Sequence, residues 1–568
     1  MSRRLLACLV AWAAACSGAP QRAQPRAVPV LTPVRTLTII GTNDLHGALV
    51  RLPLLAGYIA NVRAARAADG GGVLLVDGGD LFQGTLESNL GEGADVIRAY
   101  NAMGYAASAI GNHEFDFGPI GPAVTAQGSG DDPRGALKAR IAEAKFPFLE
   151  TDIVDDRGER IAWPNVHQTA IVDVAGVKVG LVGASTEATP TTTMPANFAG
   201  LRMTPAAAAI AEAARQVRAQ GAQVVVAVAH IGSACHDIEH HEDTSSCDKG
   251  DELFRVIDQL PPGAVDVFVG GHTHAMVAHH IDGVAAIESL SSGRAFGRVD
   301  VQLTGGKVSG TKIFEPTLVC PLDKENNAVP VADCHPGPYE GRPVVADPTV
   351  QKIVNDALAR AGARRSERLG VKLTETLTKA YGSESEEGDW FADLMLAARP
   401  DADVALTNGG GLRADIPGGE LTYGRLFEAM PFDNKFALVR VPGKGIRQLL
   451  TTNLQRTGGI LSWGGLTAKA RCKDGKLVAD VEVKGKPLSD DATYLIVTSD
   501  FLASGGDGLF ARLHLPGNAF QTTGEVIRDA MAEVLRKRGG TVDPKQSPRR
   551  LEYEGRRPLH CGSGKEEP

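Results

Sequence analysis

From residue 37 to about residue 270, short apolar runs alternate with longer alanine-rich stretches. Continuous runs of Val, Ile, Leu and Ala are typical of strands that are buried on both faces, as in parallel sheets. The predicted strands are Leu37–Gly41, Val73–Val76, Ala107–Ile110, Val179–Val182, Val224–Ala229 and Val265–Val269. The predicted helices between them include Leu54–Ala68, Ala136–Ala144 and Pro205–Ala219. This alternation restricts the chain to an α/β layered domain.

Five segments with metal-ligand residue types follow apolar runs of this kind. They are Asp44-Leu45-His46, Asp80, Gly111-Asn112-His113-Glu114-Phe115-Asp116, His230 and Gly271-His272-Thr273-His274. Functional groups of open α/β sheets collect at the carboxyl ends of strands, whereas polar residues scattered over turns would not recur at one structural position. Carboxylate, imidazole and amide ligands suit two adjacent divalent cations that share a carboxylate. The set therefore predicts a two-metal phosphoesterase.

The spacing within these segments indicates how they could hold the ions. Asp44 and His46 are two residues apart, as are the two histidines of the last segment. In an extended backbone, side chains at i and i+2 point to the same side, so each pair could reach one ion. Asp80 follows two glycines, which let the backbone turn closely beneath a metal. Asp77 lies earlier in this turn and is expected to support the loop.

A second α/β domain is predicted from about Val371 to Tyr553, after a helix that begins at Pro348 and runs to about Leu369. Its segment Thr407-Asn408-Gly409-Gly410-Gly411-Leu412-Arg413 combines glycines, which allow a ligand to approach the backbone, with an arginine that can bind phosphate through two hydrogen bonds. Phe432 and Phe501 lie on loops with glycine or proline and could stack on a flat ring from both sides. Packing in the core is the alternative for both.

These segments, from roughly Leu37 to Tyr553, resemble the 5′-nucleotidase family, which includes periplasmic UDP-sugar hydrolases. The resemblance implies a four-layer α/β/β/α metallophosphoesterase sandwich followed by a smaller α/β substrate-binding domain. It also implies two divalent ions, with Mn, Zn or Co as the expected metals. It places one ion on Asp44, His46 and His274, the other on Asn112, His230 and His272, and Asp80 between the two.

The resemblance assigns the remaining site residues as well. A metal-bridging hydroxide is expected to attack the phosphorus of a nucleotide, and His113, held by Asp116, serves the leaving group. Taken in isolation, His113 would be interpreted as a buried structural histidine. Phe432 and Phe501 match the pair that sandwiches the nucleobase, and Asp507 matches an acid that binds ribose. The other substrate-binding residues are Asn408, Gly410 and Arg413.

Two positions depart from the family pattern. His274 stands where the family often has glutamine, and either residue can coordinate a metal. The segment Ser383-Glu384-Ser385-Glu386-Glu387-Gly388-Asp389 lacks an arginine that commonly contacts phosphate, and its added acids would repel a multiply charged phosphate. UDP-sugar hydrolase and 2′,3′-cyclic nucleotide phosphodiesterase/3′-nucleotidase activities are therefore alternatives to 5′-nucleotidase activity. A non-catalytic surface binding protein on the same fold is a remote alternative, because no metal ligand is lost.

The N-terminus indicates export. Arg3 and Arg4 precede the apolar run Leu5–Ala15, which is too short to span a bilayer but suits a signal peptide. Ala13-Ala14-Ala15-Cys16-Ser17 resembles a bacterial lipoprotein cleavage site, which would give a lipid anchor on Cys16, and simple cleavage between residues 15 and 19 is the alternative. The expected location is the periplasm or, if lipid-anchored, the bacterial cell envelope.

Cysteine usage agrees with export, because the six cysteines beyond Cys16 can form three disulfides. The nearest-neighbour pairing is Cys235–Cys247, Cys320–Cys334 and Cys472–Cys561, although the sequence permits other connectivities. The histidine- and acid-rich residues between Cys235 and Cys247 could bind an accessory ion, but a solvated loop closed by a disulfide is favoured.

The length of 568 residues suits two to four domains, and a net charge of -8 without a basic stripe argues against a nucleic-acid polymer as partner. A nucleotide or related phosphoester is the expected ligand. The predicted division is a signal peptide (1–15), a flexible linker (16–35), a metallophosphoesterase domain (36–335), a linker with a helix (336–369), a nucleotide-binding domain (370–555) and a tail (556–568).

Overall fold

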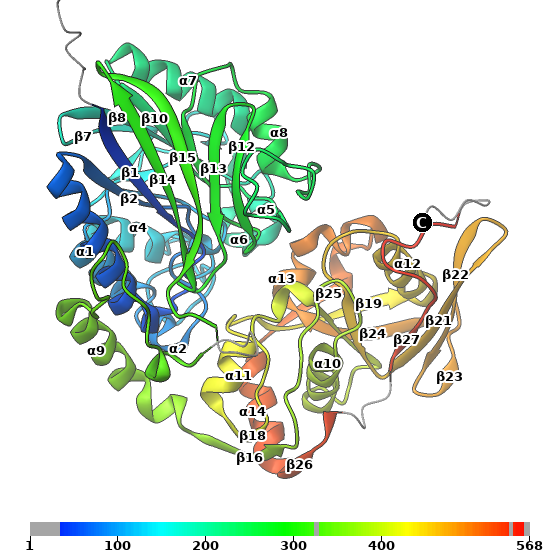
Figure 1. The fold of residues 1–568 in the computed structure, drawn as a ribbon. Helices are drawn as coiled ribbons and strands as arrows, with labels where there is room; N and C mark the ends of the chain where they lie inside the picture. The colour runs from blue at the N-terminus through cyan, green and yellow to red at the C-terminus, as the bar shows by residue number, and fades with distance from the viewer. Residues whose placement is uncertain (1–33, 323–328, 545–548, 562–568) are drawn as a thin grey trace, which may run out of the picture.

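The computed structural model describes residues 34–322, 329–544 and 549–561. Two α/β domains are joined through helix α9 (Pro348–Arg365), as Figure 1 shows. The predicted signal peptide and the candidate lipid site at Cys16 lie outside the described residues. Within the described ranges, no helix has both the length and the apolar composition needed to cross a bilayer.

The first domain is built on two stacked sheets. The seven-stranded sheet has the order β15-β14-β1-β2-β3-β4-β6, and the six-stranded sheet has the order β12-β13-β11-β10-β8-β7. The strands that lead to the ligand segments are β1 (Arg35–Thr42), β2 (Gly72–Asp77), β3 (Ala107–Ala109), β10 (Val224–His230) and β11 (Val267–Val269). β1, β2 and β3 are parallel neighbours in one sheet, and β10 and β11 are parallel neighbours in the other.

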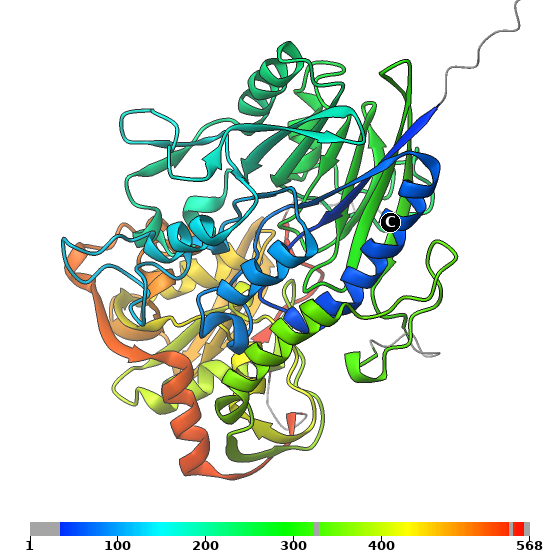
Figure 2. The same ribbon diagram turned by 90° about the vertical axis from the view of Figure 1, so that its left-hand side faces the viewer.

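Alternating side chains along these strands fill three apolar layers. In β1, Ile39 packs between the two sheets, whereas Ile40 packs against the outer helices. That outer layer consists of α1 (Leu52–Asp69), α3 (Ala94–Met103) and α4 (Gly135–Glu143), and the other sheet is covered by α7 (Ala206–Ala219) and α8 (Glu252–Asp258). Figure 2 shows the same arrangement from the side. The expected four-layer α/β/β/α sandwich is confirmed.

The second domain is a smaller α/β unit, also as expected. Its five-stranded sheet has the order β20-β17-β24-β19-β25. One face of the sheet packs on α10 (Glu386–Ala398), α11 (Tyr423–Ala429) and α14 (Ile527–Arg538). The other face packs on α12 (Gly443–Leu454) and the hairpin of β21 (Leu466–Lys473) and β22 (Lys476–Val483). The strand that leads into the glycine-rich segment is β17 (Val404–Asn408).

The linker helix differs from its predicted extent at one end. Its start at Pro348 is as predicted, and the Asp347 carboxylate caps it by accepting hydrogen bonds from the Thr349 and Val350 amides. The helix ends at Arg365 instead of Leu369, and β16 (Arg368–Leu373) follows. The physical reason is a change from helical to two-residue periodicity, because Leu369 and every second residue after it are buried.

The nearest-neighbour cysteine pairing is confirmed. Disulfides join Cys235 to Cys247, Cys320 to Cys334, and Cys472 to Cys561. The third bridge attaches the C-terminal segment to β21, so residues near Cys561 are held against the second domain.

Candidate metal centre

The five ligand segments meet at the carboxyl ends of the two parallel sets of strands. The donor atoms of Asp44, His46 and His274 all lie within 4.8 Å of one another, and so do those of Asp44, Asp80 and His230. Asp44, Asp80 and His230 are buried, so their donors are shielded from bulk water. Five segments that are far apart in sequence thus form one cluster.

One group of donors surrounds His46. His46 Nε2 lies 2.9 Å from His274 Nε2 and 3.7 Å from Asp80 Oδ2. His274 Nε2 lies 3.3 Å from Asp44 Oδ1. Side chains from both sheets therefore direct nitrogen and carboxylate oxygen atoms at one small volume.

A second group surrounds Asn112. Its Oδ1 lies 3.1 Å from His230 Nε2 and 3.1 Å from His272 Nδ1. His230 Nε2 also lies 3.1 Å from Asp80 Oδ2. Because Asp80 contacts both His46 of the first group and His230 of the second, it lies between the two groups.

The donor chemistry fits divalent cations. Nδ1 of His46 and Nδ1 of His230 each lie 2.9 Å from a backbone carbonyl, those of Gln83 and Gly78, and a carbonyl can only accept a hydrogen bond. In the neutral ring this leaves the lone pair on Nε2, which points into the cluster. Burial opposes the charged form of His230, but Asp80 outweighs it and raises the pKa of His230 to about 10, so a bound cation would displace this proton. Burial and the nearby positive charge of Arg413 hold the pKa of His46 well below its usual range, so it stays available as a ligand.

The backbone at the ligands is not extended, and the predicted geometry of the i, i+2 pairs is wrong. Asp44 and His46 have φ of 51° and 49°, and His272 and His274 have φ of 84° and 58°. Asp80, with φ of 60°, is also left-handed. Such conformations cost non-glycine residues roughly 1–3 kcal/mol and persist where the surroundings enforce them. The donors converge because the chain turns at each ligand.

Glu114, which had no predicted role, supplies part of that enforcement. Its buried carboxylate accepts hydrogen bonds from the amides of Asp80, Leu81 and Gly111 at 2.9, 2.6 and 2.6 Å. It therefore ties the Asp80 turn to the Asn112 turn. Burial and the charge of Asp80 raise the pKa of Glu114 to about 8. The sequence feature that could have indicated a role for Glu114 is its position next to His113 in the same motif.

Glu288 and Asp77 support other ligand turns. The buried Glu288 carboxylate accepts a hydrogen bond from the Thr273 hydroxyl at 2.7 Å and another from the Ser233 amide at 3.1 Å. It thus links the His272–His274 turn to the segment after His230. Asp77 accepts from the Gly79 amide at 2.9 Å, in agreement with its expected supporting role. Glu288 was not predicted, and its only sequence signal is an acid inside an otherwise apolar strand.

His113 and Asp116 form a pair at the edge of the cluster. His113 Nδ1 lies 2.5 Å from Asp116 Oδ2, and the other Asp116 oxygen accepts from the Thr193 hydroxyl at 2.9 Å. Burial opposes protonation of His113, but Asp116 and Asp80 outweigh it and raise its pKa. Because Nδ1–H faces Asp116, Nε2 is the atom left to exchange a proton with another group.

The second domain reaches the metal centre through Arg413 and Phe432. Arg413 Nη2 lies 3.1 Å from His46 Nε2 and 3.5 Å from His274 Nε2. The Phe432 ring lies 5.5 Å from the His113 ring, between centroids, and the Arg413 guanidinium lies 5.8 Å from the Phe432 ring. A cation and an aromatic ring from one domain thus face the metal ligands of the other.

A cavity of about 260 Å³ lies between the domains. Its walls include Thr191 and Thr192 from the first domain, and Gly410, Tyr381 and Asp507 from the second. The Thr192 carbonyl accepts from the Asn112 side chain at 3.0 Å, so this wall is attached to a candidate metal ligand. The cavity therefore borders a segment that is hydrogen-bonded to the candidate metal centre.

Of the other predicted contacts, Gly410 and Asp507 line this cavity, whereas Asn408 and Phe501 are not among its lining residues. Asn408 donates to Asp507 Oδ2 at 2.7 Å. The Phe501 ring packs on Gly506, where an added Cβ would lie 2.5 Å from the ring, and Phe501 is partly buried against the domain core. Phe432 and Phe501 therefore have different surroundings, one at the metal centre and one beside the Asp507 turn.

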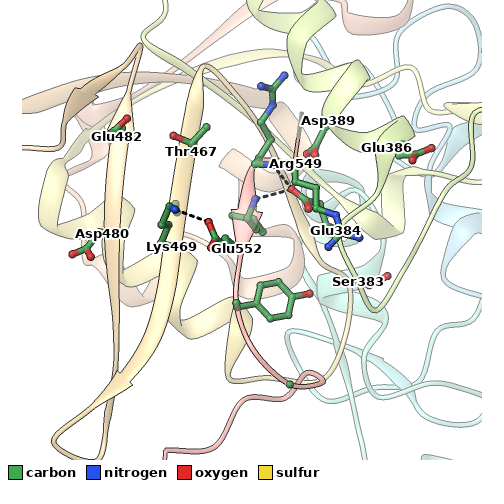
Figure 3. Close-up of a pocket in the computed structure, with 15 residues that line it drawn as sticks. Ser383, Glu384, Glu386, Asp389, Thr467, Lys469, Asp480, Glu482, Arg549 and Glu552 are labelled. Carbon is green, nitrogen blue, oxygen red and sulfur yellow. Dashed lines mark hydrogen bonds and ion pairs between the residues drawn. The ribbon is translucent and has the colours of Figure 1, made fainter. Parts of the chain in front are cut away.

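The segment without the expected arginine lies elsewhere. Ser383, Glu384, Glu386 and Asp389 line a separate cavity of about 790 Å³ within the second domain (Figure 3). Glu384 accepts hydrogen bonds from the amides of Arg550 and Leu551. Among the described residues, none of the acids in this segment lines the interdomain cavity. Because these acids line a different cavity, they repel a phosphate in the interdomain cavity less than expected from the sequence.

Comparisons with known proteins agree with the geometry. Residues 37–276 match the family model for calcineurin-like phosphoesterases, and residues 365–513 match the model for the 5′-nucleotidase C-terminal domain. The chain is 26% identical to protein UshA of Yersinia enterocolitica over 535 residues, 88% of this chain and 91% of the relative. It is 26% identical to a 5′-nucleotidase of Vibrio cholerae over 534 residues, 87% of this chain and 89% of the relative.

A solved structure has the same overall fold. The crystal structure of a 5′-nucleotidase precursor from Thermus thermophilus superposes with a TM-score of 0.71 at 24% identity, covering 91% of this chain and 99% of that one. Both domains of the fold therefore recur together in a known protein.

Proposed function

The chain belongs to the family that joins a calcineurin-like phosphoesterase domain to a 5′-nucleotidase C-terminal domain, and on this premise we propose that it removes phosphate from nucleotides as an exported, two-metal phosphohydrolase. One observation carries the proposal. Two groups of metal donors share Asp80, and Arg413 of the substrate-binding domain points at the same volume.

We assign each proposed ion to a set of residues whose nitrogen and oxygen donor atoms lie close to one another. Asp44, His46 and His274 would hold one ion, Asn112, His230 and His272 the other, with Asp80 between them. Bound divalent ions would activate the attacking water and neutralise charge on the phosphoryl group. Mn²⁺, Zn²⁺ and Co²⁺ all accept such mixed nitrogen and oxygen ligands.

His113 is the proposed acid for the leaving oxygen. Asp116 orients the ring and favours its charged form, so a proton is available at Nε2 near neutral pH. Arg413 is the proposed phosphoryl contact, because a guanidinium can donate two parallel hydrogen bonds to phosphate oxygens. Phe432 is the proposed aromatic contact beside these groups.

The Asn408–Asp507 pair is the proposed binding site for sugar hydroxyls. Asp507 lines the interdomain cavity, and a carboxylate accepts hydrogen bonds from two vicinal hydroxyls well. Gly410 lines the same cavity without a side chain, which leaves room for a ligand against its backbone. Phe501 is the proposed second aromatic contact for the base.

Export is part of the proposal and is supported by the three disulfides, which persist in oxidising compartments. Lipid attachment through Cys16 is the proposed anchored form, with cleavage without lipid as its alternative.

Substrate profiling tests the proposed activity. The metal-loaded protein is assayed for phosphate release from AMP, UDP-glucose and 2′,3′-cyclic AMP, with Mn²⁺, Zn²⁺ or Co²⁺ and after chelation. The expected result is metal-dependent turnover with AMP preferred. Absence of turnover on all three substrates with every metal would contradict the proposal and favour a binding protein on the same fold.

A second candidate is hydrolysis of UDP-sugars or 2′,3′-cyclic nucleotides, because the Ser383 segment lacks the arginine of the family pattern, although this segment does not line the interdomain cavity. The phosphodiester of a 2′,3′-cyclic nucleotide carries one negative charge, so it needs fewer cations than a phosphomonoester. A kcat/KM for UDP-glucose or the cyclic nucleotide above that for AMP would support this candidate.

A further inference from the structure

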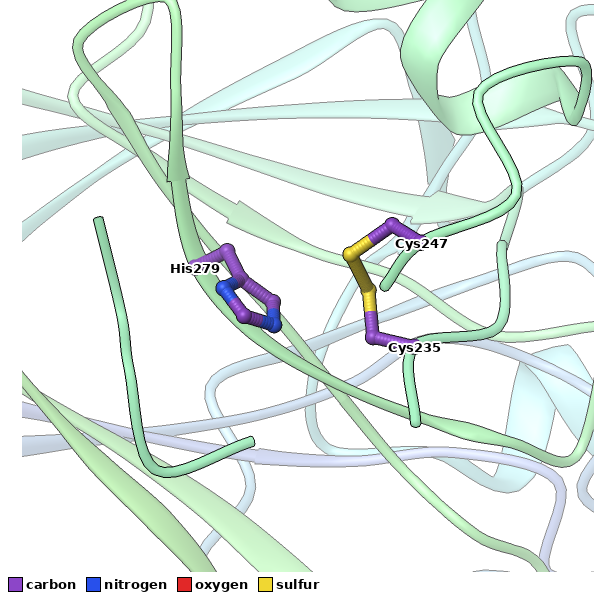
Figure 4. Close-up of side chains that lie close together, drawn as sticks. All are labelled: Cys235, Cys247 and His279. Carbon is purple, nitrogen blue, oxygen red and sulfur yellow. A yellow bond between two sulfur atoms is a disulfide. The ribbon is translucent and has the colours of Figure 1, made fainter. Parts of the chain in front are cut away.

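The loop that follows His230 carries a disulfide close to a histidine that the proposed reaction does not use. Cys235 and Cys247 close this loop, which lies along β12 (Met276–Ile281), the edge strand of the six-stranded sheet. The Cys235 amide donates to the Met276 carbonyl at 3.1 Å. His279 projects from β12 beside the disulfide (Figure 4). A ring nitrogen and both sulfur atoms lie within 4.8 Å of one another.

The protonation of His279 follows from its one hydrogen bond. Nε2 lies 2.8 Å from the Asp237 carbonyl, which can only accept, so Nε2 carries the hydrogen and Nδ1 carries the lone pair. His279 is fully buried, and its Nδ1 has no hydrogen-bond partner among the described residues. Buried polar atoms nearly always have a partner, so this lone pair is available to a ligand.

We propose that reduction of the Cys235–Cys247 disulfide turns this cluster into a zinc site, with two thiolates and His279 Nδ1 as ligands. Two thiolates and one imidazole are a ligand set that zinc prefers, and a water molecule can complete the tetrahedron. Two negative sulfurs balance the charge of Zn²⁺, so the buried site is neutral overall. Its ligands are separate from those of the catalytic cluster, and the proposal does not depend on the proposed function.

The reaction balances with a dithiol as reductant. The sulfur–sulfur bond of Cys235–Cys247 takes two electrons and two protons from the dithiol, which becomes a cyclic disulfide. Zinc then binds to the two cysteine sulfurs as their two protons leave. A disulfide oxidant takes these two electrons back as the Cys235–Cys247 bond re-forms, and the metal is released.

Cobalt spectroscopy of the purified full chain tests the site. Co²⁺ substitutes for zinc, and thiolate ligands give an intense near-ultraviolet sulfur-to-cobalt band that oxygen and nitrogen ligands do not give. After dithiol reduction, we expect this band and one further bound Co²⁺ per chain compared with the oxidised protein. Its absence from the reduced protein, with the fold retained by circular dichroism, would overturn the proposal.

Matched variants identify the ligands. Cys235→Ser/Cys247→Ser should abolish the band, whereas Cys320→Ser/Cys334→Ser removes a different disulfide and should leave it intact. His279→Gln should weaken Co²⁺ binding to the reduced protein by about tenfold or more, and it keeps the disulfide available for folding. A band that survives in Cys235→Ser/Cys247→Ser, or unchanged affinity in His279→Gln, would refute the assignment.

Discussion

Asp80 contacts both groups of metal donors, so its replacement tests the centre most directly. Asp80→Asn keeps the shape but removes the negative charge that two cations would share. Changes to residues that only support metal ligands commonly lower metal affinity or activity about 10–100-fold. Asp80 is itself a proposed ligand, so we expect the rate of phosphate release to fall at least about 100-fold and the amount of bound metal to decrease. Atomic absorption together with the phosphate assay measures both effects. Asp156→Asn, at an exposed position, is the control and should retain activity.

The His113–Asp116 pair predicts a change in the pH dependence of the reaction. Asp116 raises the pKa of His113, so the ring stays protonated until the pH rises through that value. In Asp116→Asn the pKa should fall, and the alkaline limb of the kcat profile should move to lower pH. The activity lost relative to the wild type should therefore grow as pH increases. An unshifted alkaline limb would show that His113 does not supply the proton.

At the scale of an element, the first turn of helix α10 contains a buried acid, Glu387. Both carboxylate oxygens of Glu387 are buried without a hydrogen-bond partner among the described residues, and burial raises its pKa from 4.5 to about 9. Between these two pH values the folded state holds a proton that the unfolded state has lost. Stability contributed by this group is therefore complete below pH 4.5 and is lost as the pH rises toward 9.

Glu387→Gln should remove this pH dependence. We expect the variant and the wild type to have similar stability at pH 5, and the variant to be more stable at pH 8 by on the order of 2–4 kcal/mol. Urea unfolding followed by a probe in the second domain, at both pH values, measures the difference. Glu386→Gln changes an exposed neighbour in the same turn and should have little effect at either pH. An equal stability gap at pH 5 and pH 8 would contradict the prediction.

The ligand turns show why elements were easier to predict than the geometry between them. The apolar runs identify β1, β2 and β10 because burial on both faces excludes polar residues from them. The left-handed backbone at Asp80 has no such local signal, since it is enforced by partners such as Glu114 that come from another segment. The end of α9 was misplaced by four residues because Leu369 suits the apolar pattern of either a helix or a strand.

At the scale of the whole molecule, Arg413 joins the two domains at the metal centre. Its guanidinium lies beside His46, so a substrate phosphate there would contact both domains. Arg413→Lys keeps the charge but loses the paired donors, and we expect kcat/KM for AMP to fall by about 10- to 100-fold. Steady-state kinetics measures the loss. Arg471→Lys, an exposed arginine paired with Asp480, is the control, and an equal effect in both variants would contradict the role.

The sequence by itself determined the layered α/β class, the ligand residue types and the even number of cysteines beyond Cys16, because burial periodicity and residue chemistry are local properties. Only the tertiary structure decided the distances between the donor atoms around Asp80, that Glu114 and Glu288 support their turns, and that the acids of the Ser383 segment lie away from the interdomain cavity. It also placed the buried His279 ring beside a disulfide. These facts depend on which distant segments meet, and long-range packing sets that through contacts that no short stretch of sequence contains.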